Sequence, residues 1–185
     1  MAGFVENLDR SRCGMKLHGK PIYWVDDLGT IGRGHHLICA IGTTKRQSYI
    51  EQVEPFDLPF ATLVHPSARI SSTSPIGVGA IVSAGVIVAA QSEIGSHTIL
   101  NRGVLIGHHT RIGRYVTVSP GANIAGKCVI EDGCYVAMGA IVLDGRRVGR
   151  GSVIAAGSLV TRDVPENVQG MGSPARIKKE GVDGR

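Results

Sequence analysis

The sequence predicts a mainly β protein, namely a left-handed parallel β-helix of hexapeptide repeats with about five coils, preceded by a small, incomplete Rossmann-like α/β unit. Three observations predict this fold class. Every sixth residue from Ile70 to Val160 is aliphatic, a small residue usually lies two positions before it, and 26 glycines accompany only 4% aromatic residues. This composition gives too little bulk for an ordinary β-sandwich, so a repeat architecture is the better interpretation.

The six-residue period runs without an insertion. Its aliphatic positions are Ile70, Ile76, Val82, Val88, Ile94, Leu100, Ile106, Ile112, Val118, Ile124, Ile130, Val136, Val142, Val148, Ile154 and Val160. Side chains alternate along a strand, so the aliphatic residue and the small residue before it face the same interior, and three repeats make a triangular coil of eighteen residues. Leu143 and Arg146 break the pattern, and we expect a local distortion at 143–148.

Residues eighteen apart lie above one another, about 4.8 Å from coil to coil, so the outward side chains form three faces. These faces are Arg69, Ile87, Leu105, Asn123, Ile141 and Leu159; Pro75, Glu93, Arg111, Val129 and Arg147; and Ile81, Ile99, Thr117, Tyr135 and Val153. Two of these faces are largely apolar and would be exposed to solvent in a monomer. We therefore expect both to pack against neighbours in a closed homo-oligomer, with a homotrimer as the simplest closure.

A column of glycines also follows the eighteen-residue period. Its members are Gly85, Gly103, Gly121, Gly139 and Gly157. Glycine in a β structure often marks the close approach of a ligand or of another backbone. The column therefore indicates either close subunit packing or a groove for a long, thin ligand.

The chain divides into three predicted parts, residues 1–64, 65–163 and 164–185. The first part reads as short strands at Phe4–Val5, Pro21–Trp24 and Leu37–Ile41, with helices after Asp27 and Thr44. The last part contains two prolines and a basic tail, and we expect it to cap the open end of the β-helix.

Several classes of protein are disfavoured by composition. No apolar stretch reaches the roughly 20 residues of a membrane span, and the N-terminus lacks signal-peptide features, so we expect a cytoplasmic protein without a membrane span. Cys13, Cys39, Cys128 and Cys134 show no CxxC spacing and are expected to be small, reduced residues. The net charge of +5 is scattered, which favours an anionic small ligand over nucleic acid.

Two adjacent histidines, His108 and His109, are the main candidates for chemistry, whereas His97 is expected at a coil surface. His108 lies at a corner in the column Ala90, His108, Gly126, Asp144 and Arg162. Acyl transfer needs a base and a fixed donor for the oxyanion, and a backbone N–H at Gly126 would lie one coil, about 5 Å, from His108. A corner histidine that merely bonds the adjacent turn is the structural alternative.

The hexad run, the stretch NRGVLIGHHTRIGRYVTVSPGANIAG and the ending GSLVTRDVPENVQGMGSPAR resemble the hexapeptide-repeat sugar acetyltransferases. The resemblance is to the branch that acetylates nucleotide-linked amino sugars and to the related sialic acid O-acetyltransferases. It implies a homotrimer with acetyl-CoA bound between subunits and no metal, with 1–64 as the acceptor-binding unit and 65–163 as the acyltransferase domain. The direct transfer of acetyl to an amino group, with a histidine base, is the function it implies.

The resemblance also implies roles for individual residues. The base falls on His108, the oxyanion donor on Gly126 and a substrate contact on Asn101. The acetyl-CoA contacts fall on Thr117, from across the interface, and on Met138, Gly139, Ala156 and Arg176. His109 stands where relatives commonly have an acid, and Thr117 where they often have a second histidine. The family's first strand and glycine-rich loop are not matched.

Three other functions stay open at this point. The first is O-acetylation of a sugar such as sialic acid. The second is a β-helix carbonic anhydrase, which would need three histidines on zinc, a requirement that the spacing of His97, His108 and His109 fits poorly. The third is a non-catalytic scaffold that has lost acceptor binding.

Overall fold

The computed structural model describes residues 1–185, which form two compact units. The amino-terminal unit comprises residues 1–37 and 47–60, and the β-helix unit comprises 38–46 and 61–185. The short segment Ile38–Arg46 therefore belongs with the β-helix unit, although it precedes that unit in the chain and carries no repeat signal. The functional site depends on this assignment.

The amino-terminal unit is a small α/β arrangement. Its elements are β1 (Phe4–Glu6), β2 (Lys16–Leu17), β3 (Lys20–Trp24), α1 (Leu28–Ile31) and α2 (Arg46–Val53), with 3-10 helices at Arg10–Gly14, Val25–Asp27 and Glu54–Phe56. β3 lies at the centre of the sheet, parallel to β1 and antiparallel to β2. Val25, Leu28 and Val53 form its small buried core. The strand predicted at Leu37–Ile41 is wrong, because only Leu37 makes a β-bridge, with Phe60.

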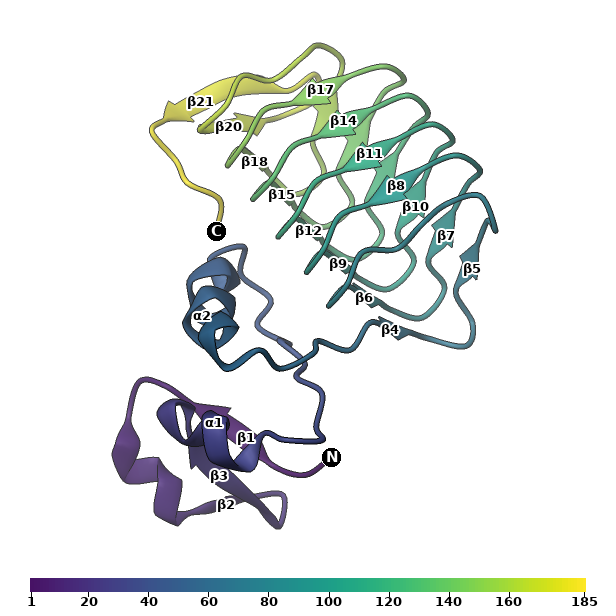
Figure 1. The fold of residues 1–185 in the computed structure, drawn as a ribbon. Coiled ribbons are helices and arrows are strands. Elements are labelled where there is room, and N and C mark those ends of the chain that lie inside the picture. The colour runs from purple at the N-terminus through teal and green to yellow at the C-terminus, as the bar shows by residue number, and fades with distance from the viewer. The chain divides into compact units, whose positions relative to one another are not determined.

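The β-helix unit is built from two-residue strands joined by four-residue corners (Figure 1). The strands are β4 (Leu63–Val64), β5 (Arg69–Ile70), β6 (Ile81–Val82), β7 (Ile87–Val88), β8 (Glu93–Ile94), β9 (Ile99–Leu100), β10 (Leu105–Ile106), β11 (Arg111–Ile112), β12 (Thr117–Val118), β13 (Asn123–Ile124), β14 (Val129–Ile130), β15 (Tyr135–Val136), β16 (Ile141–Val142), β17 (Arg147–Val148), β18 (Val153–Ile154) and β19 (Leu159–Val160). They form three sheets of four, six and eight strands, the last of which includes two longer strands after β19. Each strand pairs in parallel with the strand eighteen residues away, as Leu105 pairs with Ile87 and with Asn123. A parallel β-helix with the predicted repeat is thus confirmed.

The interior of this unit consists of the repeated aliphatic residues. All of them are at most 2% exposed except Ile70 and Ile76, which are partly buried at the first coil. The small inward residues that carry polar groups bond to the coil above. Ser92 Oγ, for example, donates to Gly107 O at 2.7 Å, and Thr110 Oγ1 donates to Ala125 O at 2.9 Å. These bonds satisfy buried hydroxyls and fix the stacking of successive coils.

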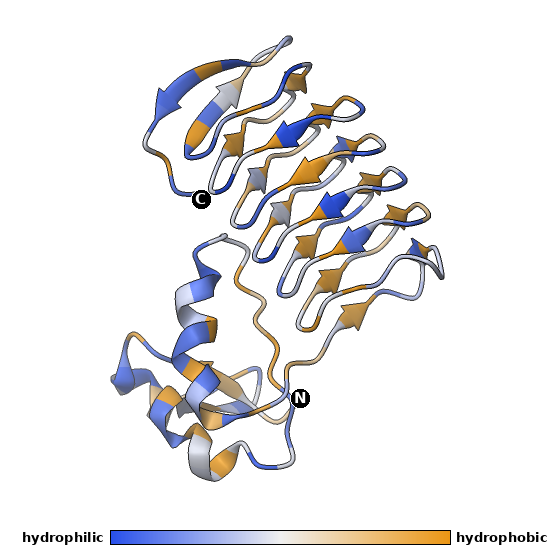
Figure 2. Cartoon of the chain, turned by 45° about the horizontal axis from the view of Figure 1, so that its top comes forward, coloured by the Kyte–Doolittle hydropathy of each residue, from blue (hydrophilic) through white to orange (hydrophobic).

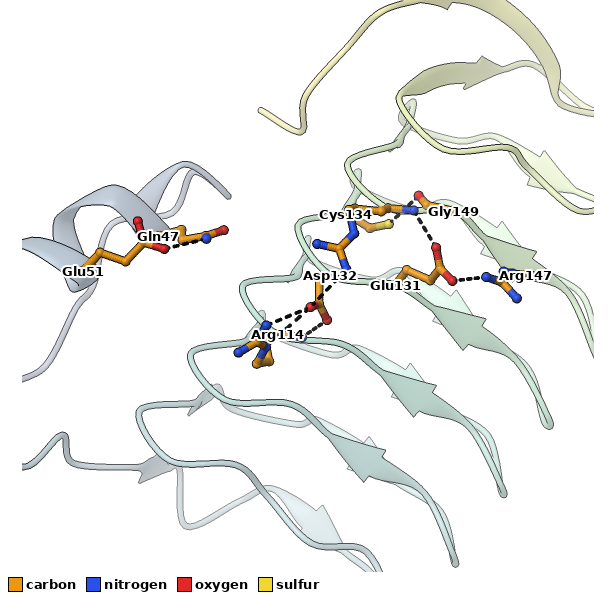
Figure 3. Close-up of polar contacts among 9 residues, drawn as sticks. Gln47, Glu51, Arg114, Glu131, Asp132, Cys134, Arg147 and Gly149 are labelled. Atoms are coloured by element: carbon orange, nitrogen blue, oxygen red, sulfur yellow. Dashed lines mark hydrogen bonds and ion pairs between the residues drawn. The ribbon is translucent and has the colours of Figure 1, made fainter. Parts of the chain in front are cut away.

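Cys128 and Cys134 occupy two of these small inward positions, as expected for buried, unpaired cysteines. The Cys134 thiol donates to Gly149 O at 3.0 Å (Figure 3). Burial raises the pKa of Cys134 to about 12, which keeps the thiol protonated near neutral pH.

The corner at 143–148 is regular, so the predicted distortion is wrong. β17 pairs with β14 in the usual register, Val129 with Arg147. Arg146 fits because its long side chain leaves the interior and its Nε donates to Asp144 O at 3.0 Å. Ion pairs between Arg147 and Glu131 and between Arg114 and Asp132 link neighbouring coils on this side (Figure 3).

The carboxyl-terminal end forms the hairpin of β20 (Val168–Met171) and β21 (Arg176–Glu180), which extends the eight-stranded sheet beyond β18. Beyond the hairpin, Arg185 N donates to Thr44 Oγ1 at 2.8 Å and Thr44 N donates to Arg185 O at 2.7 Å. No helix in the structure is long and apolar enough to span a membrane.

The two apolar faces are not equivalent. On the six-stranded sheet, Ile87, Leu105 and Ile141 are 45%, 39% and 42% exposed. On the eight-stranded sheet, Ile99 and Thr117 are only 7% and 2% exposed, and the segment Ile38–Arg46 is hydrogen-bonded along it. The second face is therefore packed within its own unit at Ile99 and Thr117, whereas Leu63 on the same face is 40% exposed. Figure 2 shows the apolar strands as orange rows beside one bluer row.

Candidate functional site

His108 and His109 lie in the corner between β10 and β11 (Figure 1). His109 has φ +57°, and this left-handed conformation turns its ring toward that of its neighbour. The two rings meet edge to face with centroids 5.1 Å apart, and the two Nδ1 atoms are 2.9 Å apart. One proton is therefore shared between the two histidines at this contact.

The position of this shared proton decides which ring can act as a base. If His108 Nδ1–H donates to His109, the Nε2 atom of His108 carries a free lone pair. The contact between the two Nδ1 atoms therefore fixes the orientation of the His108 ring and leaves its Nε2 atom as the one that can accept a proton.

Gly126 lies directly against the His108 ring, one coil further along. A Cβ atom at position 126 would be 2.9 Å from both His108 Nε2 and His108 Cε1. No side chain can be placed there while the ring keeps its position, so glycine is required by close approach. The structure thus brings His108, His109 and Gly126 together, as the predicted column indicates.

The backbone N–H of Gly126 is already used in this structure. It donates to Asp144 Oδ1, from the next coil of the same column, at 3.1 Å. The sequence placed Asp144 in this column but did not predict the bond. The donor expected for an oxyanion is therefore bonded to a carboxylate of its own chain.

Thr117 does not lie in an open groove. Its hydroxyl accepts from Arg46 at 2.8 Å and donates to Gly42 O at 3.1 Å, so the side chain is not available to a ligand here. This corrects the sequence-based assignment of Thr117 to acetyl-CoA. The physical reason is the segment Ile38–Arg46, whose position the repeat pattern does not predict.

Arg46 is the buried anchor of that segment, and sequence reasoning missed it. Its guanidinium is fully buried and donates to the carbonyls of His97, Thr43 and Val116 at 2.8, 2.6 and 2.7 Å, besides Thr117. Burial lowers the pKa of Arg46 to about 10, only partly opposed by Cys39 and Tyr115, so the group stays charged near neutral pH.

His97 is likewise buried, and the expectation of a surface position is wrong. It is 9% exposed, and its ring stacks on Tyr115 with centroids 5.6 Å apart. Burial, and then the charge of Arg46, lower the pKa of His97. This histidine belongs to the anchor of Ile38–Arg46, away from the His108 corner.

The other predicted contacts form two further groups. Met138, which is 60% exposed, and Ala156 are eighteen residues apart and lie in successive coils of one corner, beside Gly139. This corner precedes the strands of the six-stranded sheet, whereas His108 follows one of them. Within one chain the two groups therefore lie at opposite edges of that sheet. Arg176 is exposed on β21, and Asn101 is partly buried and donates to Val118 O at 3.1 Å.

The glycine column is an open stripe. All five members have φ between +64° and +70°, a conformation that suits glycine. At Gly103, Gly121, Gly139 and Gly157, an added Cβ would meet nothing within 4 Å. Within a single chain the column is therefore accessible to a ligand or to another subunit. No group of three or more His, Cys, Asp or Glu side chains is arranged to hold a metal ion.

Comparison with known families finds one match, to bacterial transferase hexapeptide repeats, over residues 127–162. A comparison with curated protein sequences returned no match. Among solved structures, GDP-perosamine N-acetyltransferase from Caulobacter crescentus, with CoA and GDP-perosamine bound, is similar at 30% identity. It has a TM-score of 0.84, and the match covers 88% of this chain and 81% of that one.

Two further structures cover more of the chain. WeeI from Acinetobacter baumannii is 26% identical with a TM-score of 0.86, covering 95% of this chain and 85% of that one. The acetyltransferase domain of PglB from Neisseria gonorrhoeae, with acetyl coenzyme A bound, has the same coverage and TM-score at 24% identity, which supports the fold alone.

Proposed function

Because the chain belongs to the hexapeptide-repeat sugar acetyltransferases, we propose that it acetylates the amino group of a nucleotide-linked amino sugar by direct transfer from acetyl-CoA. The protein is an acyltransferase, and what we propose is the acceptor on which it acts. The GDP-perosamine N-acetyltransferase structure, with CoA and GDP-perosamine bound, supports this class of acceptor. The single observation that carries the site assignment is the packing of His108 between His109 and Gly126.

His108 is the general base of the proposed reaction. Its Nε2 takes a proton from the sugar amine as the nitrogen attacks the thioester carbonyl carbon, while its Nδ1–H donates to His109. Gly126 N–H donates to the oxyanion that forms. When the intermediate collapses, the C–S bond breaks, the amide remains on the sugar, and the CoA thiolate takes up the proton. Holding both substrates in position supplies much of the remaining acceleration.

Acetyl-CoA is proposed to bind along the corner of Met138, Gly139 and Ala156, with its nucleotide end near Arg176. The open glycine stripe supports this position, because a thin ligand can approach the backbone there. Thr117 is not part of this proposal.

The proposed assembly is a homotrimer. His108 and the corner of Met138 lie at opposite edges of the six-stranded sheet, so a second copy is needed to bring base and cofactor contacts together. The exposed apolar side chains of that sheet supply an interface. We also propose a left-handed helix of about five coils with 164–185 as its cap, a Rossmann-like acceptor-binding unit at 1–64, and Asn101 as a substrate contact. The cytoplasmic location stays a prediction.

The test is incubation with acetyl-CoA and a panel of nucleotide-linked amino sugars, among them GDP-perosamine, while free thiol is followed. The matched hydroxy sugars and sialic acid separate N- from O-acetylation. His108→Ala should lower turnover by about two orders of magnitude or more, because the base is lost. Acetyl-CoA should still raise the melting temperature of this variant. His65→Ala, which alters an exposed histidine bonded to Ser67, is the control.

Two results would contradict the proposal. Full activity of His108→Ala would show that His108 is not the general base. If no thiol is released and acyl-CoA does not shift the melting temperature, the proposed acetyl transfer is wrong.

A further inference from the structure

We propose that Asp144 limits the affinity of this acyltransferase for acetyl-CoA, because its carboxylate competes with the thioester carbonyl for Gly126 N–H. This inference rests on the proposed function, because it takes Gly126 as the oxyanion donor. Asp144 would then weaken the binding of the acyl donor, and this loss of affinity would depend on the thioester carbonyl alone.

The first step is the position of the bond. Gly126 N–H points to Asp144 Oδ1 at 3.1 Å, while the Cα of the same glycine lies against the His108 ring. An acceptor oxygen on this N–H is therefore next to the proposed base. The carboxylate oxygen of Asp144 thus holds the position on Gly126 N–H that a thioester carbonyl oxygen bonded to the same N–H would take.

Second, bonds of this kind, from a backbone N–H to an aspartate of the next coil, also occur at other corners of the β-helix. Asp132 Oδ1 accepts from Arg114 N at 2.8 Å, also eighteen residues away, and Asp163 Oδ1 accepts from Arg147 N at 3.0 Å. An aspartate can therefore satisfy the N–H of a neighbouring coil wherever it stands at a corner. The bond of Asp144 differs in its location, because its donor is the glycine beneath His108.

The third step is electrostatic. A backbone N–H has one proton to donate, and a negatively charged acceptor binds it more strongly than a neutral carbonyl does. A thioester must displace or share this bond, and a carboxylate held nearby would disfavour the negative charge that develops in the transition state. Asp144 is exposed, so its side chain can turn into solvent when the thioester binds. The energy lost in this exchange should appear as weaker binding of acetyl-CoA.

The closing experiment measures the affinity of acetyl-CoA and of CoA by calorimetry, for the wild-type protein and for Asp144→Ala. CoA has the same nucleotide and pantetheine arm but no thioester carbonyl, so it does not compete for Gly126 N–H. Removing the carboxylate should tighten acetyl-CoA binding relative to CoA by about tenfold, the factor given by a difference of 1.4 kcal/mol. Asp144→Asn, which keeps a neutral acceptor, should lie between the two.

Asp132→Ala is the matched control, because it removes a corner aspartate with the same eighteen-residue bond from a site away from His108. It should leave the ratio of the two affinities at the wild-type value. Circular dichroism checks that each variant is folded, and the ratio is unaffected by a general loss of stability.

The outcomes separate the two proposals. If the wild-type protein binds neither acetyl-CoA nor CoA, the proposed function fails and the role of Asp144 fails with it. If it binds both and Asp144→Ala leaves their ratio unchanged, only the role of Asp144 is overturned. A ratio that moves equally in Asp132→Ala would also overturn it.

Discussion

Two sheets of the β-helix unit carry apolar side chains outward, and they differ in what covers them. The eight-stranded sheet is covered at Ile99 and Thr117 by a segment of its own unit, Ile38–Arg46, with Arg46 fully buried at Thr117. The six-stranded sheet keeps Ile87, Leu105 and Ile141 in solvent. The same repeat therefore produces one face for intramolecular packing and one that is free for other subunits.

The difference follows from the outward residues themselves. On the covered sheet, Thr117 supplies a hydroxyl, and the carbonyls of Val116 and His97 lie within reach of one guanidinium. A buried guanidinium is tolerated only when its donors are satisfied, and here several oxygens accept from it. On the open sheet, Ile87, Leu105 and Ile141 offer no such partners, and the polar outward residues are Arg69 and Asn123. Aliphatic surface of this kind suits a repeated contact between identical subunits.

The largest expected effect concerns the covered face. Arg46→Ala would remove the guanidinium donors to the carbonyls of His97, Thr43 and Val116 and would open a cavity, although Thr43 O and Val116 O would still accept from the backbone N–H groups of residue 46 and Ile99. We expect it to lower the free energy of unfolding by roughly 3–5 kcal/mol, measured by urea denaturation. Arg111→Ala, at an exposed ion pair with Glu93, should change it by less than about 1 kcal/mol. If both substitutions lowered the free energy of unfolding equally, Arg46 would not be the anchor of the segment.

The next effect concerns the open face. Leu105→Glu should disrupt self-association, because a charge would be placed in an apolar contact, while the exposed position allows the fold to form. Light scattering should show at least about a tenfold weaker association. Val129→Glu, at a similarly exposed position of the polar four-stranded sheet, should keep the wild-type assembly. A trimer that survives Leu105→Glu would place the interface elsewhere.

The smallest effect is a pH dependence of the covered face. The pKa of His97 is lowered in the folded protein by burial and by Arg46, so the unfolded chain binds this proton more readily. The contribution of a neutral His97 to stability is thus present above its unfolded value of about 6.5 and is lost as pH falls below it. The melting temperature should fall from pH 8 to pH 5 in the wild type. It should fall less in His97→Gln, with His65→Gln as the control.

What the sequence predicts, and what it does not, follows from the range of the interactions. The β-helix, the buried aliphatic column and the corner of His108 and His109 depend on a period of six and eighteen residues, which the chain displays directly. The contacts of Arg46 with His97 and Thr117 join residues 51 and 71 positions apart, and they lie outside any period. For this reason the sequence does not predict the burial of Thr117 and His97.

The candidate site can be predicted from the sequence only in part. The column that joins His108, Gly126 and Asp144 can be read from the spacing alone, and the structure adds the direction in which each side chain points. The backbone at His109 is left-handed, as it is at Gln91, Tyr115 and Lys127 in the same position of other corners, so the period accounts for the backbone but not for the Nδ1 contact between His108 and His109. The direction of the side chains is therefore what the sequence does not provide at the corner of His108 and His109.

The uninterrupted period also determines how the chain would respond to a change of length. Deleting eighteen residues removes one whole coil, and every later corner keeps its place above the same column. Deleting six residues between β10 and β13 keeps each aliphatic residue inside but advances every later corner by one face. Gly126 would then no longer lie beneath His108. A folded protein with an intact core would have lost its site through a rotation of about one third of a turn.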